Sequence, residues 1–248
     1  MNRLARMKPI GGFSQFFHWF LVAVVPVLAF VLVRLSFVPL AYLIVLLSKW
    51  RMFAVRPRHW PANIRANAID IIVGLSLISF IAQAPSQAWQ VVWALMYGIW
   101  LMLIKPRSST FWTTIQAGIG QLIGLGAVYV LWGRSSLLLL VVVSWAICYL
   151  SARHFFSGFD EPLGSLLSHI WGYFGAALTW VLGHWLLYYG FMSQPTLLLV
   201  ILAFGLAALY YLESTDRLSV FVRREIILIV SAVILVVIMF SDWGDKAI

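Results

Sequence analysis

The chain alternates between long apolar stretches and short polar breaks along its whole length. Between the stretches stand short segments rich in Arg, Lys, Pro, Gly or Ser, which are typical of connections between helices. Most stretches approach the roughly 20 residues that a helix needs to cross the hydrocarbon core of a bilayer. The pattern predicts an all-α transmembrane bundle of about nine helices, at 13–33, 35–48, 67–83, 87–104, 111–132, 136–150, 163–190, 196–212 and 226–241.

Two of these stretches have unusual lengths. The stretch 35–48 would form a helix only about 21 Å long, which is short for a hydrocarbon core of about 30 Å. If it is re-entrant, the bundle has eight spanning helices. The stretch 163–190 is longer than a simple span, which predicts a helix that is tilted or extends beyond the membrane.

Composition supports the membrane class. Of the 248 residues, 63% are apolar and 10% are charged, whereas a soluble domain carries about 25% charged residues. These values exclude a soluble enzyme, a disordered tail and a free nucleic-acid-binding domain. The first stretch follows Arg3, Arg6 and Lys8 and has no small-residue cleavage site, so we expect a retained helix. We therefore predict a single integral membrane domain over 1–248, without a soluble domain.

The distribution of basic residues predicts an orientation. If the N-terminus is cytoplasmic, 14 of the 17 Lys and Arg residues fall on the cytoplasmic side, and only Arg34, Arg134 and Lys246 fall outside. Lys and Arg are retained on the cytoplasmic side of cell membranes. We therefore expect a multi-pass protein of the plasma or inner membrane with its C-terminus outside. The predicted cytoplasmic loops are 49–66, 105–110, 151–162 and 213–225. The net charge of +9 then reflects topology and gives no reason to expect a nucleic-acid partner.

The long stretch 163–190 contains a polar stripe. His169, Tyr173, Trp180 and His184 recur at helical spacing and share one face. Lipid offers imidazoles no hydrogen-bond partner, so this face should point toward protein or a water-filled cavity. One interpretation is a path for a solute or proton along these residues. The alternative is a packing face whose histidines bond to neighbouring helices.

The stretch 111–132 contains a run of glycines, Gly118, Gly120, Gly124 and Gly126. Small residues four apart allow another helix backbone to approach closely, so these positions predict helix packing. The same face could serve a noncatalytic scaffold or subunit that packs against other membrane proteins.

The predicted loop 151–162 offers weak candidates for catalysis. His154, Asp160 and Glu161 combine an imidazole with carboxylates, which suits general acid–base chemistry on a lipid-linked substrate at the cytoplasmic face. However, Asp160, Glu161 and Pro162 also suit the start of the following helix. An enzyme is therefore less expected than a protein without catalytic activity.

The loop 49–66 is the longest and most basic. Its cations Arg56, Arg58 and Arg65 predict contact with anionic phospholipid headgroups, toward which each cation near the surface contributes about 1 kcal/mol. Pro57 and Pro61 argue against a continuous helix in this segment. The lipid bilayer and its anionic headgroups are thus the partners that the sequence predicts.

One absence limits the choice of function. No Asp, Glu, Lys or Arg lies near the centre of any predicted helix, and Asp70 stands about one turn into the stretch 67–83. Proton-coupled transporters commonly carry carboxylates within the membrane. The sequence shows no family signature and no motif for a metal or cofactor. Our leading hypothesis is transport or accommodation of a small or amphipathic solute, followed by a scaffold role and then by a membrane-embedded enzyme.

Overall fold

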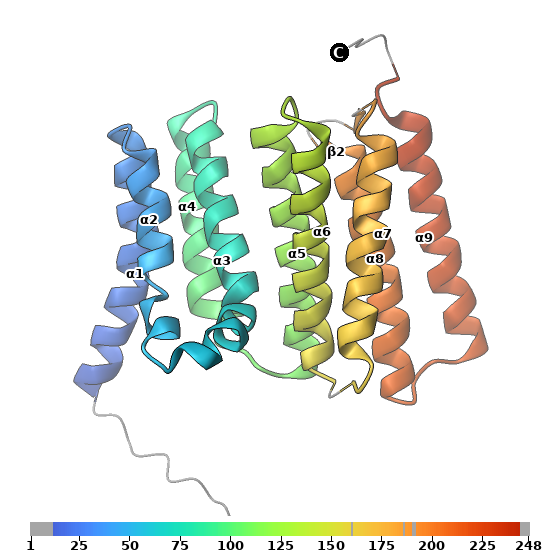
Figure 1. Cartoon of the computed structure of the whole chain (residues 1–248), viewed down its shortest axis with the longest axis horizontal. Coiled ribbons are helices and arrows are strands. Elements are labelled where there is room, and N and C mark those ends of the chain that lie inside the picture. Colours follow the sequence, from blue (N-terminus) through green and yellow to red (C-terminus); the bar gives the residue numbers. More distant parts are fainter. Residues whose placement is uncertain (1–11, 160, 186, 190–191, 244–248) are drawn as a thin grey trace, which may run out of the picture.

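The computed structural model of the chain describes residues 12–159, 161–185, 187–189 and 192–243. Within this part the fold is all-α apart from one short hairpin, and the helices stand side by side in a slab (Figure 1). The α-helices are α1 (Gly12–Arg34), α2 (Val38–Leu47), α3 (Trp60–Gln83), α4 (Gln87–Ile99), α5 (Thr110–Trp132), α6 (Leu137–Ser157), α7 (Gly164–Leu182), α8 (Gln194–Ser214) and α9 (Val220–Phe240). The shorter elements are the 3₁₀ turns η1 (Trp50–Phe53) and η2 (Pro57–His59), the π-helical segment η3 (Trp100–Ile104), and the strands β1 (Tyr188–Tyr189) and β2 (Met192–Ser193).

Local signals in the sequence explain where several helices begin. A serine precedes α4, α5, α6 and α9, and its hydroxyl accepts a hydrogen bond from the amide three residues further on. Proline stands in the first turn of α2, α3 and α8, where its missing N–H removes no helical hydrogen bond.

Four helix boundaries differ from the sequence prediction by six or more residues. Helix α9 begins at Val220 and not at 226, so the end of the predicted loop 213–225 is helical. Helix α3 begins at Trp60 and not at 67, because Pro61 occupies its first turn and does not interrupt it. Helix α6 continues to Ser157, so the first half of the predicted loop 151–162 is helical. Helix α7 ends at Leu182 and not at 190, and the chain then turns into the hairpin of β1 and β2.

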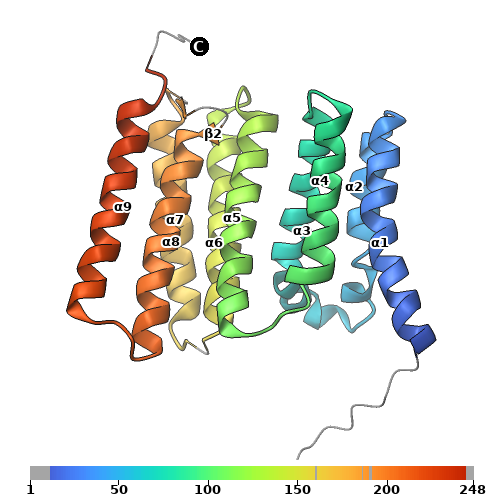
Figure 2. The ribbon, with the colours of Figure 1, turned by 180° about the vertical axis from the view of Figure 1, so that it is seen from behind.

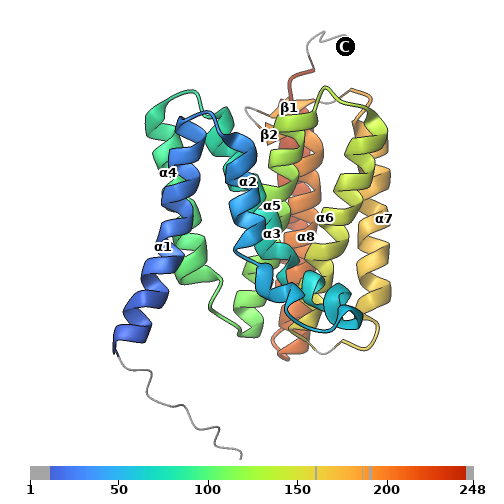
Figure 3. The ribbon, with the colours of Figure 1, turned by 60° about the vertical axis from the view of Figure 1, so that its left-hand side comes forward.

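Helix α2 is the shortest of the α-helices in the described chain. At ten residues it is about 15 Å long, which is half the thickness of a hydrocarbon core. A sharp turn with Ser36 in the left-handed region (φ 65°) joins it to α1. The turns η1 and η2 then carry the chain to the end of the slab where α3 begins (Figure 3).

Five helical segments of the described chain are long and apolar enough to cross a membrane. They are Pro57–Gln83, Gln87–Ile104, Thr110–Trp132, Leu137–Ser157 and Gln194–Ser214. Lengths and composition of this kind fit a membrane protein.

The connections between helices lie at two opposite ends of the slab. The turns after α2, η3, α6 and α8 lie at one end, here called the lower end, and those after α1, α3, α5 and α7 lie at the upper end (Figures 1 and 2). Most of the described Lys and Arg residues belong to the lower turns and the helix ends beside them, while the upper turns carry Arg34 and Arg134. The structure thus keeps the charge asymmetry that the sequence predicts.

Two hydrophobic cores divide the slab into halves. One core forms between α1, α2, α3 and the α4–η3 helix, and the other between α5, α6 and α8. We call α1–η3 the N-terminal half and α5–α9 the C-terminal half. Helices α3 and α5 pack against each other and join the halves, and α9 packs mainly on α8 at the far edge.

Candidate functional site

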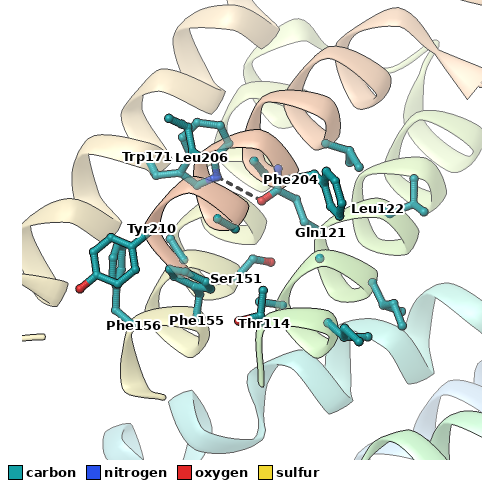
Figure 4. Close-up of a pocket in the computed structure, with 18 of the residues that line it drawn as sticks. Thr114, Gln121, Leu122, Ser151, Phe155, Phe156, Trp171, Phe204, Leu206 and Tyr210 are labelled. Carbon is teal, nitrogen blue, oxygen red and sulfur yellow. Dashed lines mark hydrogen bonds between the residues drawn. The ribbon is translucent and has the colours of Figure 1, made fainter. Parts of the chain in front are cut away.

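A cavity of about 570 Å³ lies in the C-terminal half between α5, α6, α7 and α8 (Figure 4). It begins beside Thr114 and Tyr210 near the lower end and reaches Leu122 and Val200 at about mid-height. Its volume falls within the roughly 300–1,000 Å³ that is usual for small-molecule sites. The cavity is therefore large enough to hold a ligand.

Small residues leave this space open. Gly118 on α5 lines the cavity, and a Cβ added there would have no atom within 4 Å. Ala203 and Ala207 stand one turn apart on the facing side of α8. Larger apolar side chains, among them Phe155 and Phe204, complete the walls, so the lining is mostly carbon.

Most polar groups in the cavity wall already have a partner within the protein. Gln121 donates from Nε2 to the Leu199 carbonyl at 3.1 Å and accepts from Trp171 Nε1 at 3.1 Å (Figure 4). Thr114 donates to the carbonyl of Thr110 at 2.9 Å. The two bonds of Gln121 join α5 to α8 and to α7, the bond of Thr114 lies within α5, and together they leave few polar groups for a ligand.

Two further polar groups distinguish the cavity. At its lower end, the Tyr210 hydroxyl donates to the carboxylate of Glu161, which lies just before α7. Deeper in the wall, the Oγ of Ser151 is buried and has no hydrogen-bond partner in the described chain. None of the residues that line the cavity carries a charge.

The second candidate site is a group of three charged residues in the N-terminal half, here called the ion cluster: Lys49, Asp70 and Lys105. The Nζ atoms of both lysines contact Oδ2 of Asp70. Trp100 Nε1 donates to the other oxygen, Oδ1, at 2.9 Å. The carboxylate of Asp70 therefore joins three parts of the chain: α3, which carries it, the end of α2 and the end of η3.

The members of the ion cluster differ in burial. The Lys49 and Asp70 side chains are 7% and 9% exposed, whereas Lys105 is 39% exposed and reaches the surface. Burial lowers the pKa of the Lys49 ammonium, and the adjacent Asp70 carboxylate opposes that shift. A buried ion pair of this kind depends strongly on both partners being present.

The π-helical segment η3 supplies two of the groups that contact Asp70. Within it the amide of Lys105 donates to the carbonyl of Trp100, five residues earlier, at 2.9 Å. This wider turn contains one more residue than an α-helical turn, and such segments are frequent at functional sites. It places the Trp100 indole and the Lys105 ammonium on the same carboxylate.

The position of Asp70 corrects one expectation from the sequence. Because α3 begins at Trp60, Asp70 lies ten residues into the helix and not one turn from its start. The expectation that no charged residue lies near the centre of a helix is therefore wrong for α3.

The predicted stripe on α7 lies on the outer surface of the fold. Tyr173 and Trp180 are 65% and 51% exposed, and His184 is exposed as well. His169 and His184 each bond through Nδ1 to a carbonyl of α7, at 2.8 and 2.7 Å, and the His169 ring also packs at an interplanar angle of 50° against Tyr149 of α6. The stripe would therefore contact lipid or another membrane protein.

The residues proposed for catalysis have separate partners. His154 Nε2 lies 3.0 Å from Gln116 Oε1, and Glu161 accepts hydrogen bonds from Tyr210 and from the amide of Leu163. The bond to Leu163 fits the interpretation of Glu161 as part of a helix start. Asp160 lies outside the described residues. Among the contacts of the described chain, none joins His154 to Glu161.

The arginines proposed for headgroup binding are exposed at the lower end. Arg56, Arg58 and Arg65 take part in none of the ion pairs found among the described residues. Arg58 Nε donates to Nε2 of His59 at 2.8 Å. All three side chains are thus exposed where they could contact an anionic surface.

The four glycines of α5 have different surroundings. A Cβ on Gly120 would lie 2.9 Å from Ile69 Cγ2, and one on Gly124 would lie 2.7 Å from Ile72 Cγ2, so both allow α3 to approach closely. Gly126 has only ordinary contacts, and Gly118 faces the cavity. The close-packing face at Gly120 and Gly124 is therefore occupied within the chain.

Sequence reasoning missed Ser151 and the ion cluster. The predicted loop 151–162 includes Ser151, although Ala152, Phe155 and Phe156 continue the helical spacing of apolar residues beyond it. That spacing was the signal that α6 is longer. Nothing in the sequence pairs Lys49 and Lys105 with Asp70, because these contacts depend on the packing of separate segments.

Comparison of the chain with protein-family models, curated proteins and solved structures gave no match. In the described residues, no three His, Cys, Asp or Glu side chains gather into a group that could hold a metal ion. The cavity and the ion cluster are therefore interpreted from their own geometry and chemistry.

Proposed function

We propose that this chain is a multi-pass integral membrane protein that accommodates an amphipathic molecule, with the apolar part of that molecule held in the cavity between α5, α6, α7 and α8. The observation that carries the proposal is the cavity itself, a space of about 570 Å³ among apolar helices with an almost entirely carbon lining. An apolar chain is more stable against an apolar wall than in water. Such walls therefore suit an acyl or isoprenoid chain.

The charge asymmetry of the two ends supports the proposed orientation. Lys and Arg are retained on the cytoplasmic side of a cell membrane. The lower end, with most of the described basic residues, then faces the cytoplasm, and α9 ends on the outer side. In this orientation the cavity opens in the cytoplasmic half of the bilayer, and Arg56, Arg58 and Arg65 lie at the level of the anionic headgroups.

The cavity lies on the opposite side of α7 from the solute path predicted along its histidines. Leu167, Ile170 and Trp171 of α7 line the cavity, whereas Tyr173 and Trp180 face outward. We therefore assign the solute to the cavity. The outward stripe and a subunit role stay predictions, and a subunit role needs a surface other than Gly120 and Gly124, which contact α3.

The proposal is tested by labelling the cavity with a lipid probe and by filling it with a larger side chain. Purified protein in detergent micelles is labelled with a palmitate methyl ester that carries a photoreactive diazirine in its chain, and the labelled peptides are mapped by mass spectrometry. We expect labels on cavity residues of α5, α6 and α8, and competition by unlabelled methyl palmitate. Gly118→Leu should abolish this labelling, because its side chain would enter the cavity.

Gly98→Leu is the matched control. Gly98 lies in α4, and like Gly118 it has no atom within 4 Å of an added Cβ, but it is not part of the cavity wall. This variant should be labelled like the parent protein. Labelling that spreads over outward-facing residues, or that survives Gly118→Leu unchanged, would contradict the proposed function.

A further inference from the structure

The polar groups of the cavity wall place a chemical requirement on its ligand. Gln121 and Thr114 bond within the protein, and Tyr210 bonds to Glu161. Ser151 is the exception among the polar lining residues described: its side chain is 2% exposed, and its Oγ has no partner. A buried hydroxyl without a partner costs free energy that a ligand can recover by bonding to it.

The position of Ser151 suits contact with a ligand. It lies in α6 with Ala152 and Phe155, which also line the cavity (Figure 4), and its Oγ is buried in the cavity wall. The serine side chain has three staggered rotamers, and turning about the Cα–Cβ bond moves the hydroxyl along the wall. A ligand oxygen inside the cavity can therefore reach it.

The charge of the ligand is limited by the same wall. No Asp, Glu, Lys, Arg or His is among the lining residues. A charged group in this apolar space would remain unpaired at a large cost in free energy. The enclosed part of the ligand must therefore be uncharged.

On the assumption that the cavity holds an amphipathic molecule, we infer that Ser151 recognises an uncharged oxygen on it, an ester carbonyl or a hydroxyl attached to a long apolar chain. Ester carbonyls occur in glycerolipids, and hydroxyls occur in long-chain and isoprenoid alcohols. Both can pair with a serine hydroxyl, which donates one hydrogen bond and accepts others. A fatty-acid carboxylate and a plain hydrocarbon are disfavoured, the first by its charge and the second because it leaves Ser151 without a partner.

The test changes the residue and the ligand together. Displacement of the diazirine probe is measured with methyl palmitate, hexadecanol, hexadecane and palmitate, at equal mole fractions in micelles. The proteins are the parent, Ser151→Ala and Ser144→Ala. Ser144 is the matched control, because it is a fully buried serine on the same helix but does not line the cavity.

In the parent, methyl palmitate or hexadecanol should displace the probe about 5- to 10-fold better than hexadecane, as expected for one hydrogen bond. Ser151→Ala should remove this preference, and Ser144→Ala should retain it. The ester and the alcohol distinguish the two sources of the oxygen. Removal of an unpartnered hydroxyl should leave the fold intact, so a loss of preference is not caused by unfolding.

The inference is overturned if Ser151→Ala reduces displacement of the probe by hexadecane and by the ester equally. It is also overturned if hexadecane and the ester displace the probe from the parent protein equally well. If no compound displaces the probe from the parent at all, the proposed function fails first. The two failures are distinguishable, because failure of the proposed function means that even hexadecane does not displace the probe from the parent.

Discussion

The two halves of the molecule differ in where they hold charged groups. In the N-terminal half, charged side chains are drawn inside and satisfied by one another in the ion cluster, and the helices around them are closely packed. In the C-terminal half the wall of the cavity, which is open at the surface beside Phe204, is uncharged and has few polar groups, and one of its hydroxyls has no partner. The N-terminal half thus places its buried charges in one cluster within a packed core, whereas the C-terminal half contains an uncharged cavity.

The largest effect should follow from removing the centre of the ion cluster. Asp70→Asn leaves the buried Lys49 and the half-exposed Lys105 without their carboxylate. Breaking a buried ion pair by removing one partner costs about 3–5 kcal/mol. We expect a corresponding drop in the free energy of unfolding, measured by denaturant titration in detergent micelles.

Asp216→Asn is the control for this change. Asp216 is exposed in the turn before α9 and has φ 55°, a conformation that Asn also adopts readily. Its stability should stay near that of the parent. The double variant Asp70→Leu/Lys49→Met should recover part of the loss, since apolar residues can replace a buried pair. Equal stability of Asp70→Asn and the parent would show that the ion cluster does not stabilise the N-terminal half.

A smaller loss should follow Trp100→Phe, which keeps an aromatic ring but removes the N–H that donates to Asp70 Oδ1. Hydrogen bonds to charged groups contribute about 1.5–3 kcal/mol. The same titration should show a loss in that range, and in the Asp70→Leu/Lys49→Met background the loss should shrink, because the carboxylate is gone. A loss that is the same in both backgrounds would assign the effect to packing of the ring.

The two faces of α5 provide the third comparison. Gly120→Ala should destabilise the protein by about 1 kcal/mol, because overpacking against Ile69 outweighs the better helix propensity of alanine. In Gly118→Ala, two residues earlier, the added methyl group points into the cavity. The free energy of unfolding should therefore equal or slightly exceed that of the parent. Thermal unfolding of both variants in micelles checks the sign. A loss at Gly118 as large as at Gly120 would mean that the cavity closes in solution.

The smallest effect is expected at the exposed pair of Arg223 and Glu213, which are 3.4 Å apart and more than half exposed. Surface ion pairs contribute about 0–1 kcal/mol and are screened by salt. Arg223→Gln should therefore change the midpoint of unfolding little, and less still in high salt. A loss comparable to that of Asp70→Asn would contradict the distinction between buried and surface charges on which the comparison depends.

Much of the fold could be predicted from the sequence, because apolar stretches and capping residues are local signals. The positions of α4 with η3 and of α5 agree with the predicted 87–104 and 111–132 to within one residue. The errors arose where one signal has two meanings. Pro61 argues against a helix in the middle of a segment, but here it lies in the first turn of α3. The polar residues after position 150 predict a loop, but here they belong to the last turns of α6.

The candidate sites were less predictable, for a physical reason. A cavity exists because several small side chains on different helices meet, and its lining cannot be identified from any one of those helices alone. Gly118 and Gly120 look equivalent in the sequence, yet one faces open space and the other packs against Ile69. Likewise, Lys49 and Asp70 are 21 positions apart and become partners only when α2 and α3 are packed together.

The π-helical segment has an evolutionary consequence. Its extra residue holds Trp100 and Lys105 in a register that an uninterrupted α-helix would rotate away from Asp70. A deletion of one residue between Tyr97 and Lys105 would restore a regular helix and separate the indole from the ammonium. In an alignment of descendants of a common ancestor, a one-residue gap at this point should therefore coincide with replacement of the aspartate. Chains without the gap should retain the aspartate.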